Sequence, residues 1–237
     1  ATTLNETICS PNSYSFNGQS YSTTGTYTAT LTNAAGCDSV ITLNLTVNQP
    51  SASTINQTIC SPNTYSFNGQ SYSTTGTYTA TLTNAAGCDS VITLNLTVNP
   101  RPVFSVSLNG TPYNAQAGGH TISTCNNNNY SFTLAGVSSG SLPLVGTIRV
   151  WDGLIGTGTA GPIFTDTINS IGDLIYSAPS GSVNAGTWSV EFIAVTDANG
   201  CSADLSGGSM NFTFNVSDPS ATTLNETICS PNSYSFN

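Results

Sequence analysis

The chain has 237 residues, of which only 2 are Lys or Arg, 11 are Asp or Glu and 1 is His, and its net charge is -9. Few side chains are therefore present to act as acids, bases or nucleophile activators, and the composition argues against an enzyme. The shortage of cations likewise argues against binding of nucleic acid or of an anionic membrane surface, and no apolar run approaches the roughly 20 residues of a membrane span.

The first 50 residues predict short strands in chain order. Asn17-Gly18 lies between the aromatic residues of 14–16 and Tyr21, which is the signature of a tight type I′ hairpin. Apolar residues then alternate with Thr or Asn over 27–31 and again over 41–47, and Asn33-Ala34-Ala35-Gly36 turns the chain between these two runs. Alternation of period two is typical of half-buried strands.

The same pattern is repeated. Residues 52–99 match residues 1–48 except at four aligned positions, and residues 221–237 are identical to residues 1–17, so the order small, small, large recurs every 220 residues. We expect the sequence to sample a longer tandem array. Prolines at 50, 100, 102 and 219 mark the boundaries, because proline favours extended linkers and ends strand pairing. The predicted domains are 1–50 and 51–100, both small, then a larger domain at 101–219, and the start of the next small repeat at 220–237.

The larger domain continues the strand pattern. Apolar residues recur at spacing two over 130–134, 188–194 and 210–216, and Trp151 and Trp188 are expected in the core. The turn 197–201 parallels the turn 33–37, with a cysteine at the end of each. We therefore predict an all-β protein of tandem immunoglobulin-like sandwiches in a linear array, built from short antiparallel strands.

Seven cysteines are present, at Cys9, Cys37, Cys60, Cys88, Cys125, Cys201 and Cys229. Two fall in each domain, which predicts one disulfide per domain: Cys9–Cys37, Cys60–Cys88 and Cys125–Cys201, with Cys229 pairing beyond the end of the sequence. Domains of about 50 residues have small cores and need such a bridge. Disulfides place the protein outside the cell. There is no Cys-x-x-Cys, and His120 is expected in an exposed loop, so neither a metal site nor a cofactor is predicted.

Three short motifs are candidate modification sites. Asp38-Ser39-Val40, Asp89-Ser90-Val91 and Asp166-Thr167-Ile168 resemble the Asp-Ser/Thr-aliphatic O-glycosylation sequence of secreted Bacteroidota proteins. This resemblance makes Ser39, Ser90 and Thr167 candidate O-glycosylation residues. The alternative is an ordinary strand start whose hydroxyl group faces water.

The repeats carry a wider resemblance. The small-unit sequence from Tyr14 to Asn48 resembles the tandem repeats of giant Bacteroidota cell-surface proteins exported by the type IX system. The stretch Thr196–Cys201 is similar to repeats in the gliding-motility adhesins of that group and in their PKD-like domains. The resemblance implies export, anchoring at the cell surface and adhesion.

These observations lead to a structural hypothesis. We expect a segment of an extracellular cell-surface adhesin or fibre that serves as a disulfide-stapled stalk in attachment or gliding. Its partners would be neighbouring repeats of the same chain, and surface glycans or a solid substratum. One alternative is a homopolymeric extracellular filament, since the chain has no lysine that would discourage its strand edges from pairing with another chain. A second alternative is glycan binding by residues 101–219.

Overall fold

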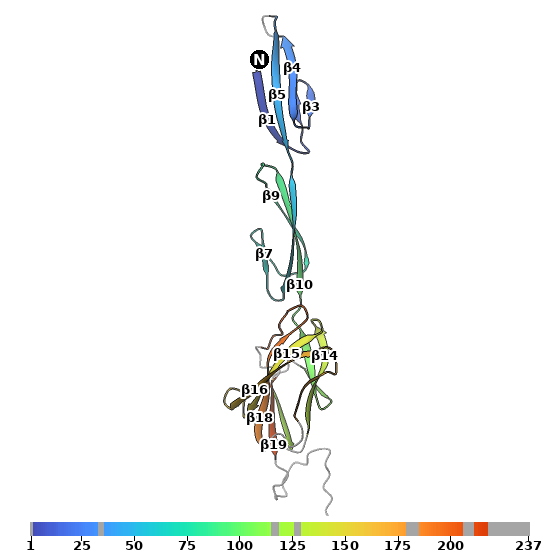
Figure 1. Ribbon diagram of the computed structural model, residues 1–237, viewed down its shortest axis with the longest axis vertical. Helices are drawn as coiled ribbons and strands as arrows, with labels where there is room; N and C mark the ends of the chain where they lie inside the picture. The colour runs from blue at the N-terminus through green and yellow to red at the C-terminus, as the bar shows by residue number, and fades with distance from the viewer. Residues whose placement is uncertain are drawn as a thin grey trace, which may run out of the picture. The chain divides into compact units, whose positions relative to one another are not determined.

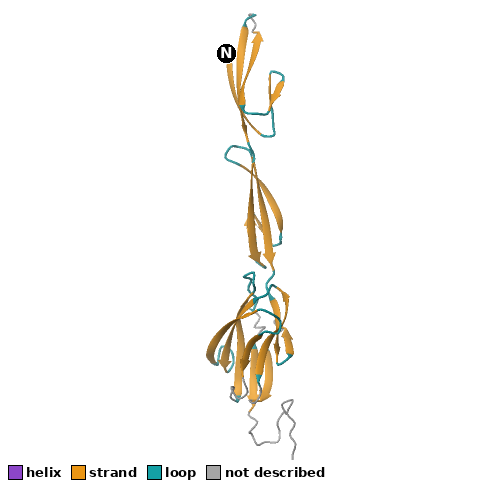
Figure 2. Ribbon diagram, turned by 45° about the vertical axis from the view of Figure 1, so that its right-hand side comes forward, coloured by secondary structure: helices purple, strands orange, loops and turns teal. Residues whose placement is uncertain are grey.

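The structure is a computed structural model that describes residues 2–32, 36–114, 119–125, 129–178, 185–205 and 211–217. The repeat start at 220–237, with Cys229, lies outside these residues. The described part of the chain contains strands and turns without a helix (Figure 2), and so holds no helix able to cross a membrane. The chain forms two compact units. The first comprises 1–59 and 64–98, and the second comprises 60–63 and 99–237.

Each small repeat is a three-stranded sheet covered by a hairpin. In the first repeat, β1 (Thr2–Cys9), β5 (Asp38–Asn48) and β4 (Gly25–Thr32) form a sheet in the order β1-β5-β4, and these strands lie side by side in Figure 1. The hairpin pairs β2 (Tyr14–Phe16) with β3 (Gln19–Tyr21). Asn17 and Gly18 have φ values of 49° and 78°, which confirms the predicted tight turn.

The second repeat has the same plan. Its sheet has the order β6-β10-β9, from β6 (Ser51–Cys60), β10 (Asp89–Asn99) and β9 (Gly76–Thr83). Its hairpin pairs β7 (Tyr65–Phe67) with β8 (Gln70–Tyr72). The predicted domain boundaries stay a prediction, although each repeat has a sheet and an apolar cluster of its own.

The core of a small repeat is minimal. Among the described residues of the first repeat only Phe16, Ala29, Leu43 and Leu45 are buried, and half-buried tyrosines and aliphatic side chains pack against them. Leu43 and Leu45 come from alternate positions of β5, as the period-two pattern requires. Four buried side chains supply little apolar burial for a unit of this length, and domains with cores this small are commonly stabilised by covalent links.

The larger repeat is a two-sheet sandwich. One sheet has the order β12-β11-β14-β17, from β12 (Thr111–Asn114), β11 (Val103–Leu108), β14 (Tyr130–Ser139) and β17 (Leu174–Ala178). The other has the order β13-β19-β18-β15-β16, from β13 (His120–Cys125), β19 (Phe212–Ser217), β18 (Gly186–Thr196), β15 (Leu144–Asp152) and β16 (Thr159–Ile168). The all-β, immunoglobulin-like sandwich class is thus confirmed.

Aromatic side chains fill the space between these two sheets. Phe132, Phe212 and Phe214 are fully buried, and Trp188 stacks on Phe214 with ring centroids 4.1 Å apart. The prediction that Trp188 is a core residue is confirmed, because only 5% of it is exposed. Trp151 does not join this cluster. It is half-buried on β15, and the prediction that it lies in the core was wrong.

Two further expectations need correction. Strands β1 and β13, which each end in a cysteine, run parallel to the last strand of their repeat, β5 and β19, so the strands are not all antiparallel. A connection of many residues lets the two strands meet in this orientation, which a hairpin cannot do. His120 begins β13 and does not lie in an exposed loop. Its ring packs between Tyr113 and Phe212, with centroids 4.8 and 5.2 Å away.

Candidate functional site: the disulfides between repeats

The disulfides join different repeats. Cys9 bonds to Cys88 with their Cα atoms 5.6 Å apart, and Cys60 bonds to Cys201 with their Cα atoms 5.5 Å apart. Each bond therefore runs from one repeat to the next along the chain. The predicted pairs Cys9–Cys37, Cys60–Cys88 and Cys125–Cys201 were wrong, and so was the expectation that each domain is closed by a bridge of its own.

The parallel strand pairing explains this error. Cys9 is in register with Asn48, at the end of β5, whereas Cys37 directly precedes Asp38, at the start of β5. Eleven residues of strand separate these two levels, which is about 35 Å at the rise of a β-strand. A disulfide needs Cα atoms within about 7 Å. The two cysteines of one repeat therefore lie at opposite ends of its sheet and cannot meet.

The larger repeat separates its cysteines in the same way. Cys125 is in register with Ser217, and its neighbour Thr124 is level with Val216, which pairs with Gly186 at the start of β18. Cys201 follows the far end of β18. The missed signal was the order of the motifs. A cysteine that ends a strand and a cysteine that precedes the last strand are brought to opposite ends of the sheet whenever these two strands pair in parallel.

The turn that carries Cys88 is built by one asparagine. The side-chain Oδ1 of Asn84 accepts hydrogen bonds from the backbone N–H groups of Ala86 and Cys88, at 3.0 and 2.9 Å. The backbone closes the same turn, because the N–H of Gly87 donates to the carbonyl of Asn84 at 3.0 Å. Gly87 has a φ of 80°, which a residue with a Cβ rarely adopts. Asn-Ala-x-Gly-Cys thus presents the cysteine in a fixed direction, and only 2% of Cys88 is exposed.

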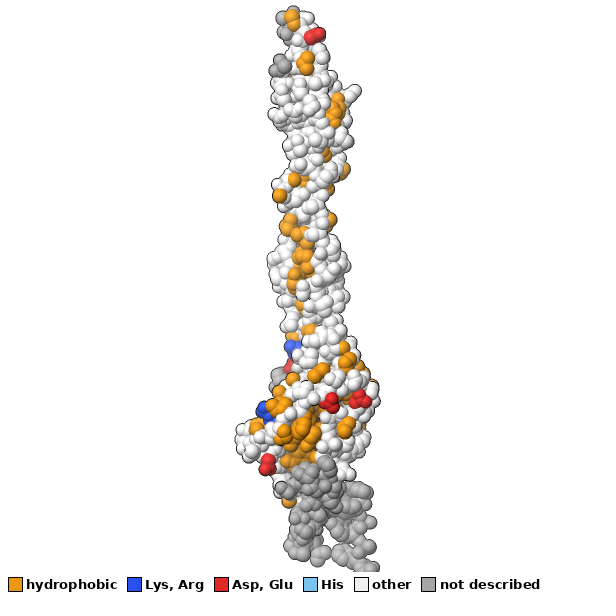
Figure 3. Space-filling model, viewed as in Figure 1, with side chains coloured by type: hydrophobic (Ala, Val, Ile, Leu, Met, Phe, Trp, Pro, Cys, Tyr) orange, Lys and Arg blue, Asp and Glu red, His pale blue; other side chains and the backbone are white. Residues whose placement is uncertain are grey.

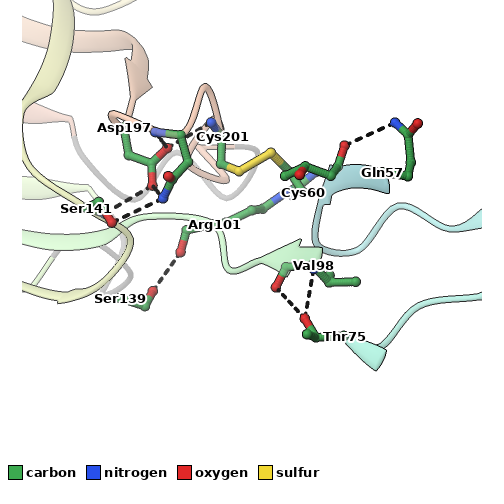
Figure 4. The surroundings of a disulfide bond; sticks show 11 residues. Gln57, Cys60, Thr75, Val98, Arg101, Ser139, Ser141, Asp197 and Cys201 are labelled. Carbon is green, nitrogen blue, oxygen red and sulfur yellow. Dashed lines mark hydrogen bonds between the residues drawn. A yellow bond between two sulfur atoms is a disulfide. The ribbon is translucent and has the colours of Figure 1, made fainter. Parts of the chain in front are cut away.

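The turn that carries Cys201 has the same hydrogen bonds, with an aspartate in place of the asparagine (Figure 4). Oδ1 of Asp197 accepts from the N–H groups of Asn199 and Cys201, at 3.0 and 2.8 Å. Its other oxygen, Oδ2, accepts from the N–H of Ser141 at 3.1 Å, which ties the turn to the loop before β15. Asp197 is 5% exposed, so these bonds satisfy a buried carboxylate.

The strand-end cysteines are also held by their own repeat. The N–H of Ser10, directly after Cys9, donates to the carbonyl of Asn48 at 2.9 Å. The equivalent bond in the second repeat joins Ser61 to Asn99 at 2.8 Å. Each strand-end cysteine is consequently fixed at the point where the chain leaves its repeat, and this is the point that the turn of the next repeat must reach.

Hydrogen bonds support the bond between the two small repeats. The side-chain amide of Asn48 donates to the carbonyl of Ala86 at 2.8 Å, and the amide of Asn84 donates to the carbonyl of Gln49 at 3.1 Å. The linker after β5 is therefore bound to the same turn that bears Cys88. Linker, turn and disulfide act together as one joint, and the two small repeats belong to a single compact unit.

The three candidate glycosylation residues lie on strands. Ser39 and Ser90 are half-buried near the starts of β5 and β10, while Thr167 is exposed on β16. The carboxylate of Asp166 accepts a hydrogen bond from the N–H of Thr167 at 2.7 Å. Thr167 thus has the most accessible hydroxyl-bearing side chain of the three, on the outermost strand of its sheet.

Metal binding and sugar stacking both depend on side chains of the described residues. Among those residues no group of three or more His, Cys, Asp or Glu side chains could hold a metal ion. Trp151, which might have offered a ring to a sugar, is covered by Arg149 at 5.6 Å and donates its Nε1–H to Glu191 at 2.8 Å. The face drawn in Figure 3 is mostly uncharged and polar, with apolar side chains gathered on the larger repeat.

No family model matches the chain, and no curated protein matches it. Among solved structures, it is similar to one described as protocadherin gamma B7 extracellular cadherin domains 1–4, with 10% sequence identity over 81% of this chain and a TM-score of 0.23. The match covers 56% of that protein's chain. The fold assignment given above rests on strand topology, and the two disulfides are typical of extracellular and secreted proteins.

Proposed function

We propose that this chain is a load-bearing segment of an extracellular adhesin or fibre at the bacterial cell surface. The observation that carries the proposal is the overlap of the two disulfide loops. Cys60 lies in sequence between Cys9 and Cys88, and Cys88 lies between Cys60 and Cys201. A covalent route therefore runs from the first repeat to the larger repeat that bypasses most of the backbone.

This connectivity suits a chain that is pulled from its ends. If the first or the larger repeat loses its fold under force, the disulfides prevent most of its residues from extending, whereas residues 60–88 of the second repeat stay in the load-bearing route. The small cores make this protection necessary, because four buried side chains resist unfolding weakly. In the chain-entropy model, loops of 79 and 141 residues are worth roughly 4 to 5 kcal/mol each, as much as the net stability of many small domains.

The bacterial and adhesive parts of the proposal draw on the resemblance of the repeats to gliding-motility adhesins. The low content of charged residues and the scarcity of titratable groups support a structural role in preference to catalysis. Type IX export, gliding and modification of Thr167 belong to the same proposal. Mass measurement of the native protein tests the modification, with Thr167→Val as the control that must abolish any added mass at that residue.

The test of adhesion is detachment of cells in shear flow. Cells that display the full-length adhesin with Cys9→Ser and Cys88→Ser in every copy are compared with cells that carry Ser13→Thr. The control is harmless by design, because Thr64 occupies the same place in the second repeat. We expect the cysteine variant to detach at lower shear stress at equal surface amounts. Equal detachment of the two strains would contradict the proposal.

A second function is favoured by one specific observation. Strand β16 lies at the edge of its sheet and is exposed over almost its whole length, including Ile163 at 52% and Phe164 at 42%. An exposed apolar edge is a template for pairing with another chain. A homopolymeric filament would show as concentration-dependent assembly in sedimentation, abolished by Ile163→Lys and not by Thr157→Lys in an exposed turn. A monomer at all concentrations would leave the single-chain stalk as the function.

A further inference from the structure

The cysteines fall into two structural classes. Four of them begin the motif Cys-x-x-x-x-Tyr-Ser-Phe, namely Cys9, Cys60, Cys125 and Cys229. The three that the structure describes are each the last residue of a strand: Cys9 of β1, Cys60 of β6 and Cys125 of β13. The other three cysteines end the sequence motif Asn/Asp-Ala-x-Gly-Cys, namely Cys37, Cys88 and Cys201, and are called turn cysteines here because this motif forms a turn at Cys88 and Cys201. Both disulfides join a strand-end cysteine to the turn cysteine of the following repeat. A single pairing rule therefore accounts for both bonds.

Cys125 has the backbone position of a strand-end cysteine. It is the last residue of β13, and β13 runs parallel to β19, the last strand of the larger repeat. Cys9 is likewise the last residue of β1, which runs parallel to the last strand of its repeat. By the rule, the partner of Cys125 is the turn cysteine of the repeat that follows, and residues 221–237 are identical in sequence to residues 1–17 of the first repeat.

Cys37 has the position of a turn cysteine, the kind that bonds to a strand-end cysteine of the preceding repeat. Gly36 before it has a φ of 84°, close to the 80° of Gly87 and the 76° of Gly200 before the two bonded turn cysteines. A strand begins directly after Cys37 at Asp38, as one begins at Asp89 after Cys88. The environments differ in one respect. Cys88 and Cys201, which are joined to a preceding repeat, are 2% and 0% exposed, whereas Cys37 is exposed.

We propose that Cys125 forms a disulfide with Cys37 of the next copy when copies of this chain follow one another with the period of 220 residues. Cys37 of the next copy stands at position 257, which is 132 residues after Cys125. This separation lies between the 79 and 141 residues of the two bonds in the structure. The two thiols lose two protons and two electrons, and a thiol–disulfide oxidant outside the cell takes them up as its own disulfide is reduced.

The third bond makes the covalent chain of loops continuous. Cys125 precedes Cys201, so its loop overlaps the loop of Cys60, and Cys229 precedes position 257, so the next loop overlaps in turn. Every joint between repeats is then closed by a disulfide of the same kind. This inference extends the proposed load-bearing function from one copy to successive copies, and rests on it.

The test uses two copies in one chain, with residue 220 followed by residues 1–237. The sequence identity of 221–237 with 1–17 means that the first 237 residues of this chain are unchanged. Cys125→Ser in the second copy leaves only the Cys125 of the first copy, so its reactivity can be measured without interference. The protein is denatured without reduction, its thiols are alkylated, and its peptides are identified by mass spectrometry. We expect Cys125 to escape alkylation and to be recovered in a peptide linked to residues around Cys37.

Two matched variants decide the outcome. Cys37→Ser in the second copy should make Cys125 fully reactive to the alkylating agent, while Cys37→Ser in the first copy should leave it protected. Alkylation of Cys125 in the parent chain would overturn the proposal, as would a link from Cys125 to a strand-end cysteine such as Cys229. If Cys125 does not pair with Cys37, the disulfides Cys9–Cys88 and Cys60–Cys201 are still present in each copy. Force measurements on single copies therefore test the proposed function separately.

Discussion

Stretching single molecules of this protein should show that most of its backbone is hidden from force until the disulfides are reduced. The full chain is held between handles at its two ends and pulled until every repeat has unfolded. The quantity of interest is the fully extended length between Cys9 and Cys201, measured first in the oxidised protein and then after a phosphine reductant is added.

The connectivity sets both lengths. In the oxidised protein the shortest covalent route crosses from Cys9 to Cys88, runs back along the chain to Cys60, and crosses to Cys201. The backbone from 60 to 88 has 28 residues, which extend to about 100 Å, and the two disulfides add about 10 Å. After reduction the 192 residues from 9 to 201 extend to about 670 Å. Reduction should therefore release roughly 560 Å.

Paired variants test each link. Replacing Cys9 and Cys88 by serine leaves the route along residues 9–60 and through the second disulfide, which extends to about 180 Å. Replacing Cys60 and Cys201 leaves residues 88–201, which extend to about 400 Å. Bridges within each domain would instead leave residues 37–60 and 88–125 extensible, for about 220 Å in the oxidised protein. An oxidised length near that value would refute the pairing and the reasoning from it.

A simpler chemical measurement checks the same pairing. The chain has two arginines and no lysine, and Arg101 precedes a proline, so trypsin cuts the denatured protein after Arg149. With Cys125→Ser and Cys229→Ser present, the two pieces should stay joined on a non-reducing gel through Cys60. Adding Cys60→Ser should separate them. Separation before this last change would show that Cys201 is not linked to Cys60 and would contradict the pairing.

Three further outcomes follow from the geometry. Asp197→Ala removes the acceptor for the buried turn N–H groups and should lower the free energy of unfolding by roughly 2 to 4 kcal/mol. Asp197→Asn keeps an oxygen acceptor, as Asn84 does in the second repeat, and should cost less than half as much. Urea titrations of the oxidised protein measure both effects. Gly18→Ala, at a φ of 78°, should cost about 1 to 2 kcal/mol. Gly119→Ala, whose nearest neighbouring atom among the described residues is 3.9 Å from the added Cβ, should be neutral, and equal effects would contradict the turn assignment. Burial raises the pKa of Tyr130 above its usual 10.0, and its hydrogen bond to Thr124 offsets part of this shift. Because the unfolded chain loses this proton first, the free energy of unfolding should fall as the pH rises above about 10. Tyr130→Phe should reduce the slope of this fall with pH.

Local sequence chemistry was enough for the strands and the tight turns. The alternation of Leu43 and Leu45 with Thr and Asn marks β5 because successive side chains of a strand face opposite sides. Asn17-Gly18 marks the hairpin because both positions need a positive φ. Asn109-Gly110, with φ values of 48° and 87°, carries the same signal between β11 and β12 and could have been read in the same way.

The pairing of the cysteines depended on the tertiary structure. Equal spacing of 28 residues within each small repeat pointed to a bridge inside the repeat, but spacing along the chain carries no information on which end of a sheet a residue occupies. The parallel alignment of β1 with β5 places Cys9 and Cys37 at opposite ends, about 35 Å apart. The sequence by itself therefore determined an all-β chain of repeats with cysteines at two defined positions. Only the folded chain decided that these cysteines join one repeat to the next, because the direction in which the first and last strands pair is a long-range choice.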